Sequence, residues 1–201
     1  MNLLLYGNPI LRKRARALRR ADKSTSALLD EMMQVMQEAP GVGLAAPQVG
    51  HPVRVVAVMV DDIDYRLINP KIVRRAGRVE GTEGCLSLPT LYGTVERPEC
   101  VTVRALMEKM KPVTIRAEGF LARVLAHEID HLDGKLFIDR ADEETLHWIV
   151  ADDEEENGYR AVPATLAEAT ERFEHLRKGA LAGDDVAQRL AHADMPGPRG
   201  L

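Results

Sequence analysis

Two histidines four residues apart, the first followed directly by a glutamate, restrict the fold of this chain more than any other feature. The segment reads His127-Glu128-Ile129-Asp130-His131. In a helix each residue turns by about 100°, so both imidazoles lie on one side, one turn apart, and can reach a single metal ion. The Glu128 carboxylate lies on the same broad side, where it can act on a water molecule without being a ligand. The pattern predicts a helix that carries a catalytic metal.

Apolar residues extend the histidine side of this helix toward its beginning. Phe120 and Val124 precede His127 at helical spacing. An apolar wall beside a metal suggests a pocket for an apolar side chain. We therefore expect both residues to contact substrate.

Catalytic metal sites typically use three protein ligands and leave one position for water. Downstream of the histidines nothing singles out one candidate among Glu143, Glu144 and Glu154. Upstream, Cys85 lies in the segment Glu83-Gly84-Cys85-Leu86-Ser87-Leu88-Pro89. A cysteine taken alone is more often a buried structural residue. Joined to two histidines, Cys85 becomes the better third ligand, because a thiolate binds zinc or ferrous iron strongly.

A third segment of small residues precedes the other two, and together they carry a family resemblance. It reads Gly41-Val42-Gly43-Leu44-Ala45-Ala46-Pro47-Gln48. In this order and spacing, the three segments resemble the peptide deformylases. The resemblance extends over roughly residues 3–140. One departure is Ala126, because many members have a glutamine directly before the first histidine.

The resemblance implies a role for each residue of the site. Cys85, His127 and His131 would hold one divalent metal ion, ferrous iron in preference to zinc or nickel. Glu128 would be the general acid and base. The Gln48 side chain and the Leu86 backbone N–H would bind the oxyanion.

The implied substrate is the formyl group on the N-terminal methionine of newly synthesised polypeptides. The substrate backbone would pair as an added strand with the chain near Val42, Gly43 and Gly84. The methionine side chain would rest against Phe120 and Val124. Glycines at such positions let a peptide approach the backbone closely.

Composition agrees with a soluble protein and favours no nucleic-acid partner. The 201 residues suffice for one domain with a real core, and the formal net charge of −4 gives no case for specific DNA binding. No apolar run approaches a membrane span, and no secretory signal is present. The only cysteines are Cys85 and Cys100. These features predict reduced thiols and a cytoplasmic location.

The expected fold is α+β, with antiparallel strands around the central helix over residues 119–132. Residues 24–38 read as a helix that Ser24 or Ser26 can cap. Apolar runs predict a buried strand over 53–60, a turn at Asn69-Pro70 before a short strand over 71–73, and a hairpin of 101–106 with 113–117.

The character of the chain changes after residue 140. We expect a metallohydrolase domain over 1–140 and a C-terminal extension over 141–201. The extension opens with an acidic loop at residues 152–156 and continues with a helix over 165–178, on which Leu166, Ala169, Phe173 and Leu176 share one side. The tail, rich in proline and glycine, is expected to be disordered.

For several residues around the motifs, the sequence allows two different roles. Glu83 and Arg97 either pair to hold the cysteine segment, or Arg97 lies in solvent. Asp130 either fixes the helix from behind or is a plain surface carboxylate. Tyr92 packs in the core or lines the entrance. The basic residues 12–20 are either a solvated segment or a contact with the ribosome.

Three rival functions remain open at the level of sequence. A zinc endopeptidase with a glutamate as third ligand would keep its metal after Cys85→Ser. A cysteine hydrolase using Cys85 with a histidine base would work in chelator and fail after alkylation. A non-catalytic metal protein that contacts the ribosome would bind metal without turnover, but Glu128 would then have no task.

Overall fold

The computed structural model describes residues 2–39, 41–156 and 158–181. Within these residues, three α-helices and nine β-strands, joined by short 3-10 turns, form an α+β fold, as predicted. The helices are α1 (Lys23–Glu38), α2 (Gly119–Leu132) and α3 (Leu166–Leu181). The strands are β1 (Gly43–Ala45), β2 (Val55–Val60), β3 (Ile63–Ala76), β4 (Val79–Cys85), β5 (Leu88–Arg97), β6 (Cys100–Leu106), β7 (Pro112–Glu118), β8 (His147–Ala151) and β9 (Tyr159–Pro163).

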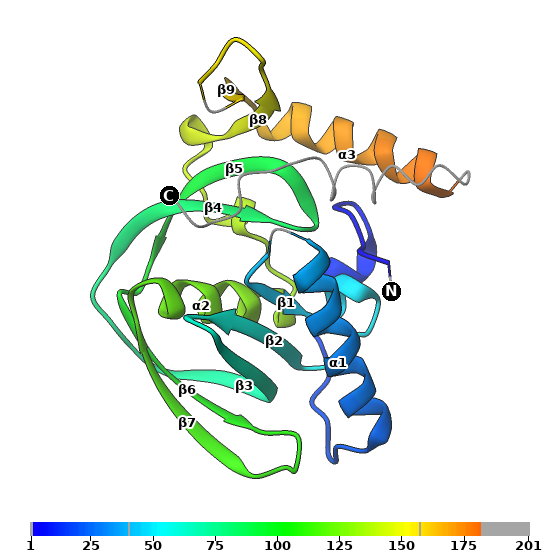
Figure 1. Ribbon diagram of the computed structural model, residues 1–201, viewed down its shortest axis with the longest axis vertical. Helices are drawn as coiled ribbons and strands as arrows, with labels where there is room; N and C mark the ends of the chain where they lie inside the picture. The colour runs from blue at the N-terminus through cyan, green and yellow to red at the C-terminus, as the bar shows by residue number, and fades with distance from the viewer. Residues whose placement is uncertain (1, 40, 157, 182–201) are drawn as a thin grey trace.

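Two antiparallel sheets enclose the motif-bearing helix. One has the order β1-β2-β3-β6-β7, and the other has the order β4-β5-β8-β9. Helix α2 lies across the first sheet with β4 on its other side, so that it occupies the centre of the molecule (Figure 1). Strands β1 and β4 are each at the edge of a sheet. Their outer edges carry backbone groups that another extended chain can pair with.

Strand β2 shows why the five-stranded sheet has two buried faces. Val56, Val58 and Val60 pack in one core cluster with residues of α2. Val55 and Ala57 point the other way and pack with the methionines of α1. Because successive side chains in a strand alternate between faces, a strand covered on both sides must be apolar throughout. This accounts for the apolar run, and it confirms the predicted strand.

Helix α1 begins one residue earlier than predicted, and its cap is a different residue. The Asp22 carboxylate accepts hydrogen bonds from the backbone N–H of Ser24 and Thr25, at 3.0 and 3.2 Å. The Thr25 hydroxyl in turn accepts from the Asp22 N–H, which completes a capping box. The expectation that Ser24 or Ser26 caps the helix was therefore wrong. A carboxylate just before the first turn also matches the helix dipole.

Strand β3 does not break where the sequence predicted a turn. It continues through Asn69, which has a φ of 53°, and its pairing with β6 shifts register between Ile68 and Lys71. The Asn69 side chain accepts from the Leu18 N–H and donates to the Leu18 carbonyl, at 2.8 and 2.7 Å. Asparagine tolerates the left-handed backbone conformation that a β-bulge can require. The Asn69-Pro70 pair, which we predicted to form a turn, therefore marks a bulge inside one continuous strand.

The C-terminal extension supplies two strands of the second sheet. Strand β8 pairs with β5 through Leu91 and Trp148, and β9 completes the sheet. The helix of the extension is confirmed, and it buries Ala169 and Phe173 completely. Phe173 contacts the rings of Tyr6 and Trp148. Strands β8 and β9 were not predicted, and the domain boundary at residue 140 stays a prediction.

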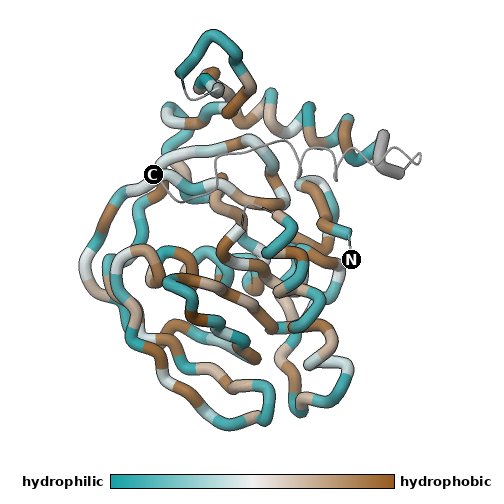
Figure 2. Tube along the Cα trace, viewed as in Figure 1, coloured by the Kyte–Doolittle hydropathy of each residue, from teal (hydrophilic) through white to brown (hydrophobic). Residues whose placement is uncertain are grey.

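Hydropathy follows this architecture along the chain. Apolar segments line the interior at β2 and α2, whereas the connection between β8 and β9 is strongly hydrophilic (Figure 2). That connection holds the acidic residues 152–156, of which all but the first are exposed. The tail that was predicted to be disordered lies outside the described residues. In the part of the chain that the structure describes, no helix is both long and apolar enough to cross a membrane.

Candidate metal centre and active site

Cys85, His127 and His131 meet at one point between α2 and the end of β4. Their candidate ligand atoms all lie within 4.8 Å of one another. The Cys85 Sγ is 3.3 Å from the His131 Nε2, which is 3.2 Å from the His127 Nε2. Among the described residues, no other cluster of three histidine, cysteine or acidic side chains has this geometry. The structure therefore brings together the three residues predicted as ligands.

The donor set fits a divalent metal. The His127 Nδ1 lies 2.9 Å from the Glu83 Oε2, so a proton on Nδ1 leaves the Nε2 lone pair facing Cys85 and His131. The His131 Nδ1 is buried without a hydrogen-bond partner among the described residues. One thiolate with two imidazoles is a ligand set suited to zinc or ferrous iron.

Glu83 is the acceptor that fixes the first histidine. Arg97 donates to both of its carboxylate oxygens at 2.8 Å, and Arg123 donates to one at 2.8 Å. Burial alone would raise the pKa of Glu83, but the hydrogen bonds from Arg97 and His127, with their charges, outweigh it and hold that pKa far below its usual value. The predicted Glu83–Arg97 pair is confirmed. Arg97 is only 3% exposed, so the solvent-exposed alternative was wrong.

Asp130 holds the helix from another side. It accepts a hydrogen bond from the Arg97 Nη1, and Arg140 donates to its two oxygens at 2.6 and 2.9 Å. Burial raises the pKa of Asp130, but these two guanidinium groups more than offset it and lower the pKa below its usual value. Asp130 is thus a buried anchor of α2, and the reading as a surface carboxylate was wrong.

Glu128 is buried next to the backbone of β1. A Cβ atom on Gly43 would lie 2.4 Å from the Glu128 Oε1, so a side chain at this position would force the Glu128 carboxylate or β1 to move. The Glu128 Oε2 has no hydrogen-bond partner among the described residues. Burial, with a smaller contribution from the charge of Glu83 and against the charges of His127 and Arg97, raises the pKa of Glu128 to about 7. A carboxyl group with this pKa can take and give a proton near neutral pH.

Gln48 is buried and points its amide toward the cysteine. Its Oε1 accepts from the Ala45 N–H at 2.8 Å, which turns the Nε2 toward the Cys85 Sγ at 3.5 Å and the Ser87 Oγ at 3.3 Å. Leu86 follows Cys85 in the turn between β4 and β5. Both residues predicted to bind the oxyanion therefore lie next to the metal centre.

The residues predicted to contact substrate lie on or next to β1, β4 and α2. Val42 and Gly43 belong to the edge at β1, and Gly84 belongs to the edge strand β4. A Cβ on Gly84 would lie 2.6 Å from the Tyr92 ring, which packs over the glycine and stacks on His147. Phe120 is 47% exposed, whereas Val124 is buried. Phe120 thus offers an accessible apolar surface at the beginning of α2.

Known proteins are similar to this chain in sequence and in fold. A family model described as polypeptide deformylase matches residues 1–147. The chain belongs to the peptide deformylase family. Members of this family are metal-dependent hydrolases, and the resemblance inferred from the three sequence segments is confirmed.

Individual deformylases match over most of their length. Peptide deformylase 1 of Clostridium acetobutylicum is 46% identical over 135 residues, which cover 67% of this chain and 90% of that protein. The peptide deformylase of Symbiobacterium thermophilum is 49% identical over 150 residues, covering 73% and 68%. The structure of Arabidopsis thaliana peptide deformylase 1B with an inhibitor matches with a TM-score of 0.73 and 29% identity, covering 98% of this chain and 97% of that one.

Some residues of this deformylase site were not found by sequence reasoning, and some candidates are far from it. Arg123 was missed, although its position four residues before His127 places it on the same side of the helix. Arg140 was also missed, because it lies beyond the end of α2 and no sequence pattern links it to the site. Glu143, Glu144 and Glu154 are exposed and do not join the metal cluster, which removes the support for a glutamate as third ligand.

Proposed function

We propose that this protein removes the formyl group from the N-terminal N-formylmethionine of newly synthesised polypeptides by metal-dependent hydrolysis. One observation carries the proposal. Cys85, His127 and His131 converge within 4.8 Å, and Glu128, whose Oε2 has no hydrogen-bond partner among the described residues, is next in sequence to His127. Membership of the deformylase family supplies the reaction class.

Cys85, His127 and His131 would hold the metal, which we expect to be ferrous iron, with zinc or nickel as replacements. When bound, a divalent metal lowers the pKa of a water molecule from about 15.7 toward about 7 and polarises a carbonyl oxygen. The Glu83 carboxylate keeps His127 in the tautomer that presents Nε2.

Glu128 would move the protons of the reaction. Its free Oε2 would take a proton from the attacking water and then deliver it to the departing amine nitrogen. An amine is a poor leaving group unless it is protonated, so both transfers are needed.

Gln48 and Leu86 would stabilise the oxyanion that forms on the formyl carbon. The Gln48 amide is held in place by its bond to Ala45, so its Nε2 needs no reorganisation during the reaction. The Leu86 backbone N–H would be the second donor. One such donor contributes on the order of 3 kcal/mol to the transition state.

The two sheet edges support a peptide substrate. A formylated nascent chain would extend the sheet at Val42 and Gly43 and would touch Gly84 on β4, which is strand addition at a sheet edge. The methionine side chain would rest on Phe120 and Val124. We place the reaction in the cytoplasm, where polypeptides are made.

Residues 12–20 are our candidate contact with the ribosome. Most of their side chains are exposed, although Arg12 is held by Asp139 and Ala15 is buried. Anionic RNA would attract such a segment. Co-sedimentation with ribosomes should fall for the double variant Arg19→Gln/Arg20→Gln, and unchanged co-sedimentation would contradict this contact.

The reaction is tested by formate release from an N-formylmethionyl peptide, using protein loaded anaerobically with ferrous iron. Glu128→Gln keeps the shape of the side chain and should lower kcat by about 10²–10⁴-fold with the metal content unchanged. The matched control is Glu118→Gln at the exposed N-cap of the same helix, which should leave kcat unchanged. Wild-type protein that holds metal yet releases no formate would contradict the proposed reaction.

A cysteine hydrolase is the one rival that a contact favours, because the Cys85 Sγ lies 3.3 Å from an imidazole nitrogen. That mechanism has no use for a second histidine or for Glu128. Formate release that survives a strong chelator, but not alkylation, would support the rival. We expect the chelator to abolish turnover and added ferrous iron to restore it.

A further inference from the structure

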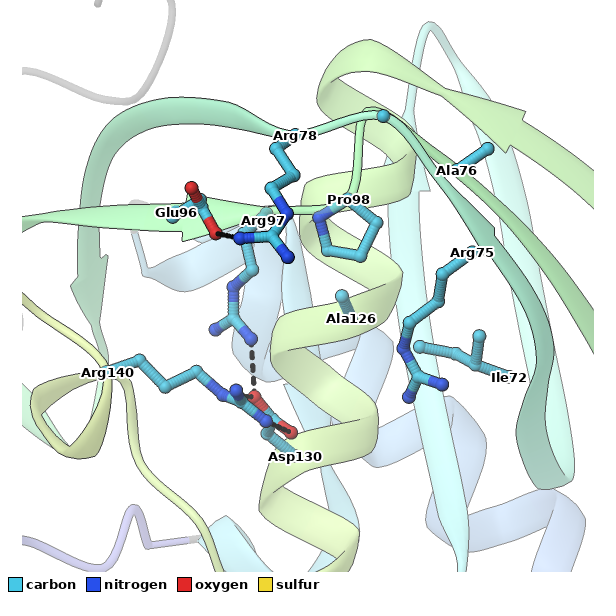
Figure 3. A pocket seen from close by; sticks show the side chains of 11 residues that line it. Ile72, Arg75, Ala76, Arg78, Glu96, Arg97, Pro98, Ala126, Asp130 and Arg140 are labelled. Atoms are coloured by element: carbon cyan, nitrogen blue, oxygen red, sulfur yellow. Dashed lines mark hydrogen bonds and ion pairs between the residues drawn. The ribbon is translucent and has the colours of Figure 1, made fainter.

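A cavity lies beside α2, on a side of the helix that is turned by about 100° around the helix axis from the histidine side. It has a volume of about 420 Å³ and is bounded by α2, the end of β3, the β3–β4 turn and the end of β5 (Figure 3). Ala126 and Asp130 form its side on α2. The cavity belongs to neither the metal centre nor the two sheet edges of the proposed substrate site.

Charged side chains dominate the walls of this arginine cavity. Four guanidinium groups and two carboxylates line it: Arg75, Arg78, Arg97, Arg140, Glu96 and Asp130. The lining residues therefore carry an excess of two positive charges. Cationic clefts of this kind concentrate anions.

Two of the four guanidinium groups are only weakly paired or have no partner among the described residues. Arg97 is fully engaged by Glu83 and Asp130, and Arg140 donates through two nitrogens to Asp130. Arg78 has a single bond of 3.2 Å to Glu96, and both of these side chains are mostly exposed. Arg75 has no hydrogen-bond or ion-pair partner among the described residues, and its side chain reaches toward the cavity beside Ile72 (Figure 3). Arg75 and Arg78 can thus bind a ligand without giving up a buried partner.

The floor of the cavity is apolar and small. Ile72 and Ala126 are buried, and the single methyl group of Ala126 leaves room between the arginines.

We propose that the arginine cavity binds a small phosphate monoester through Arg75 and Arg78, with Arg140 at its far side. A terminal phosphate carries close to two negative charges at neutral pH, which matches the excess of two positive charges on the walls. Guanidinium groups form paired hydrogen bonds with phosphate oxygens. The volume lies in the range of small-molecule pockets and exceeds the need of a bare ion.

Calorimetric titration of the metal-loaded protein with glycerol 3-phosphate at pH 7.5 tests the proposal. Saturable binding is expected, and the double variant Arg75→Gln/Arg78→Gln should raise Kd at least tenfold. The matched control Arg74→Gln/Arg116→Gln removes the same charge from exposed positions outside the cavity lining and should leave Kd unchanged. Since all four side chains are exposed, both variants should keep the wild-type melting temperature in phosphate-free buffer.

Two further arms identify the source of the phosphate. Glycerol, which lacks the phosphate, should not bind. A short RNA without a terminal phosphate should bind the wild type no more tightly than it binds the double variant Arg75→Gln/Arg78→Gln, which we call the cavity variant. Equal Kd values for wild type and cavity variant would overturn the proposal, because the phosphate would then sit elsewhere, for example at the metal. Equally tight binding of RNA with and without a terminal phosphate would overturn the preference for a dianion.

Discussion

Helix α2 carries reactive groups on one side and a saturated ion-pair network on another. On the histidine side, the Glu128 Oε2 and the His131 Nδ1 are buried and have no hydrogen-bond partner in the described part of the chain, and three donor atoms lie within 4.8 Å of one another. On the Asp130 side, Arg97 uses all three of its nitrogens on Glu83 and Asp130. Both sides are buried, but only the second satisfies its polar groups.

The difference indicates that the two sides of α2 serve different purposes, stability on the Asp130 side and turnover on the histidine side. Buried polar atoms without partners cost stability, so such a site persists only where neighbouring interactions hold its geometry. Glu83 links the two sides, because it binds Arg97 and His127 at once. Variants on the Asp130 side should therefore cost mainly stability, and variants on the histidine side should cost mainly turnover.

Arg97→Met gives the largest expected effect. It leaves the carboxylates of Glu83 and Asp130 buried with fewer partners, and removing one member of a buried network typically costs about 3–5 kcal/mol of unfolding free energy. Denaturant unfolding of metal-loaded protein measures the loss. Arg104→Met, an exposed arginine on β6, is the control and should change stability by less than about 0.5 kcal/mol. A loss below about 1 kcal/mol for Arg97→Met would break the comparison.

Gln48→Glu probes the histidine side with little change in shape. The new side chain keeps an acceptor for the Ala45 N–H but loses the amide donors, so we expect kcat to fall by about 10²–10³-fold. The loss of unfolding free energy should be smaller than for Arg97→Met. Gln34→Glu on the exposed side of α1 is the control. A higher KM with kcat unchanged would mean that Gln48 contacts the substrate equally in ground and transition states.

The two sides also differ in how far the sequence predicted them. Two histidines at helical spacing define their own geometry, so the histidine side follows from a local pattern. Cys85 lies more than forty positions away in sequence and was assigned by joining it to the histidines, supported by the order of three segments. The Asp130 side depends on contacts between β5, α2 and the chain after it, and no local pattern encodes the position of Arg140.

The secondary structure was likewise predicted only where a local sequence pattern encodes it. Strand β2 was predicted because burial on both faces demands an apolar run, whereas Val79–Cys85 mixes glutamate, glycine and threonine and has no such signature. Strands β8 and β9 flank an acidic loop, which hid them in a polar context. Asp22 was overlooked as a cap because the serines after it are equally good caps in isolation.

Gly43→Ala tests whether the histidine side tolerates crowding. The added methyl group would meet the Glu128 carboxylate at 2.4 Å and must displace it or β1, and a shift of about 1 Å can cost on the order of 10²-fold in rate. Formate release and metal content are measured together. Gly41→Ala is the control, because its methyl group would meet only the end of the Leu86 side chain, which can rotate. Equal activity of the two variants would show that Glu128 is not held against Gly43.

Arg140→Gln should have the smallest effect, and it separates the two partners of Asp130. The Arg140 side chain is 39% exposed, so solvent screens its pair with Asp130, and Arg97 remains as the buried partner. We expect a loss of about 0–1 kcal/mol of unfolding free energy, which high salt should reduce further. Because both arginines bind the same carboxylate, Arg140→Gln should cost more in the Arg97→Met background than alone. Strictly additive losses would mean that Asp130 does not couple the two arginines, and the network on this side of α2 would then be two independent pairs.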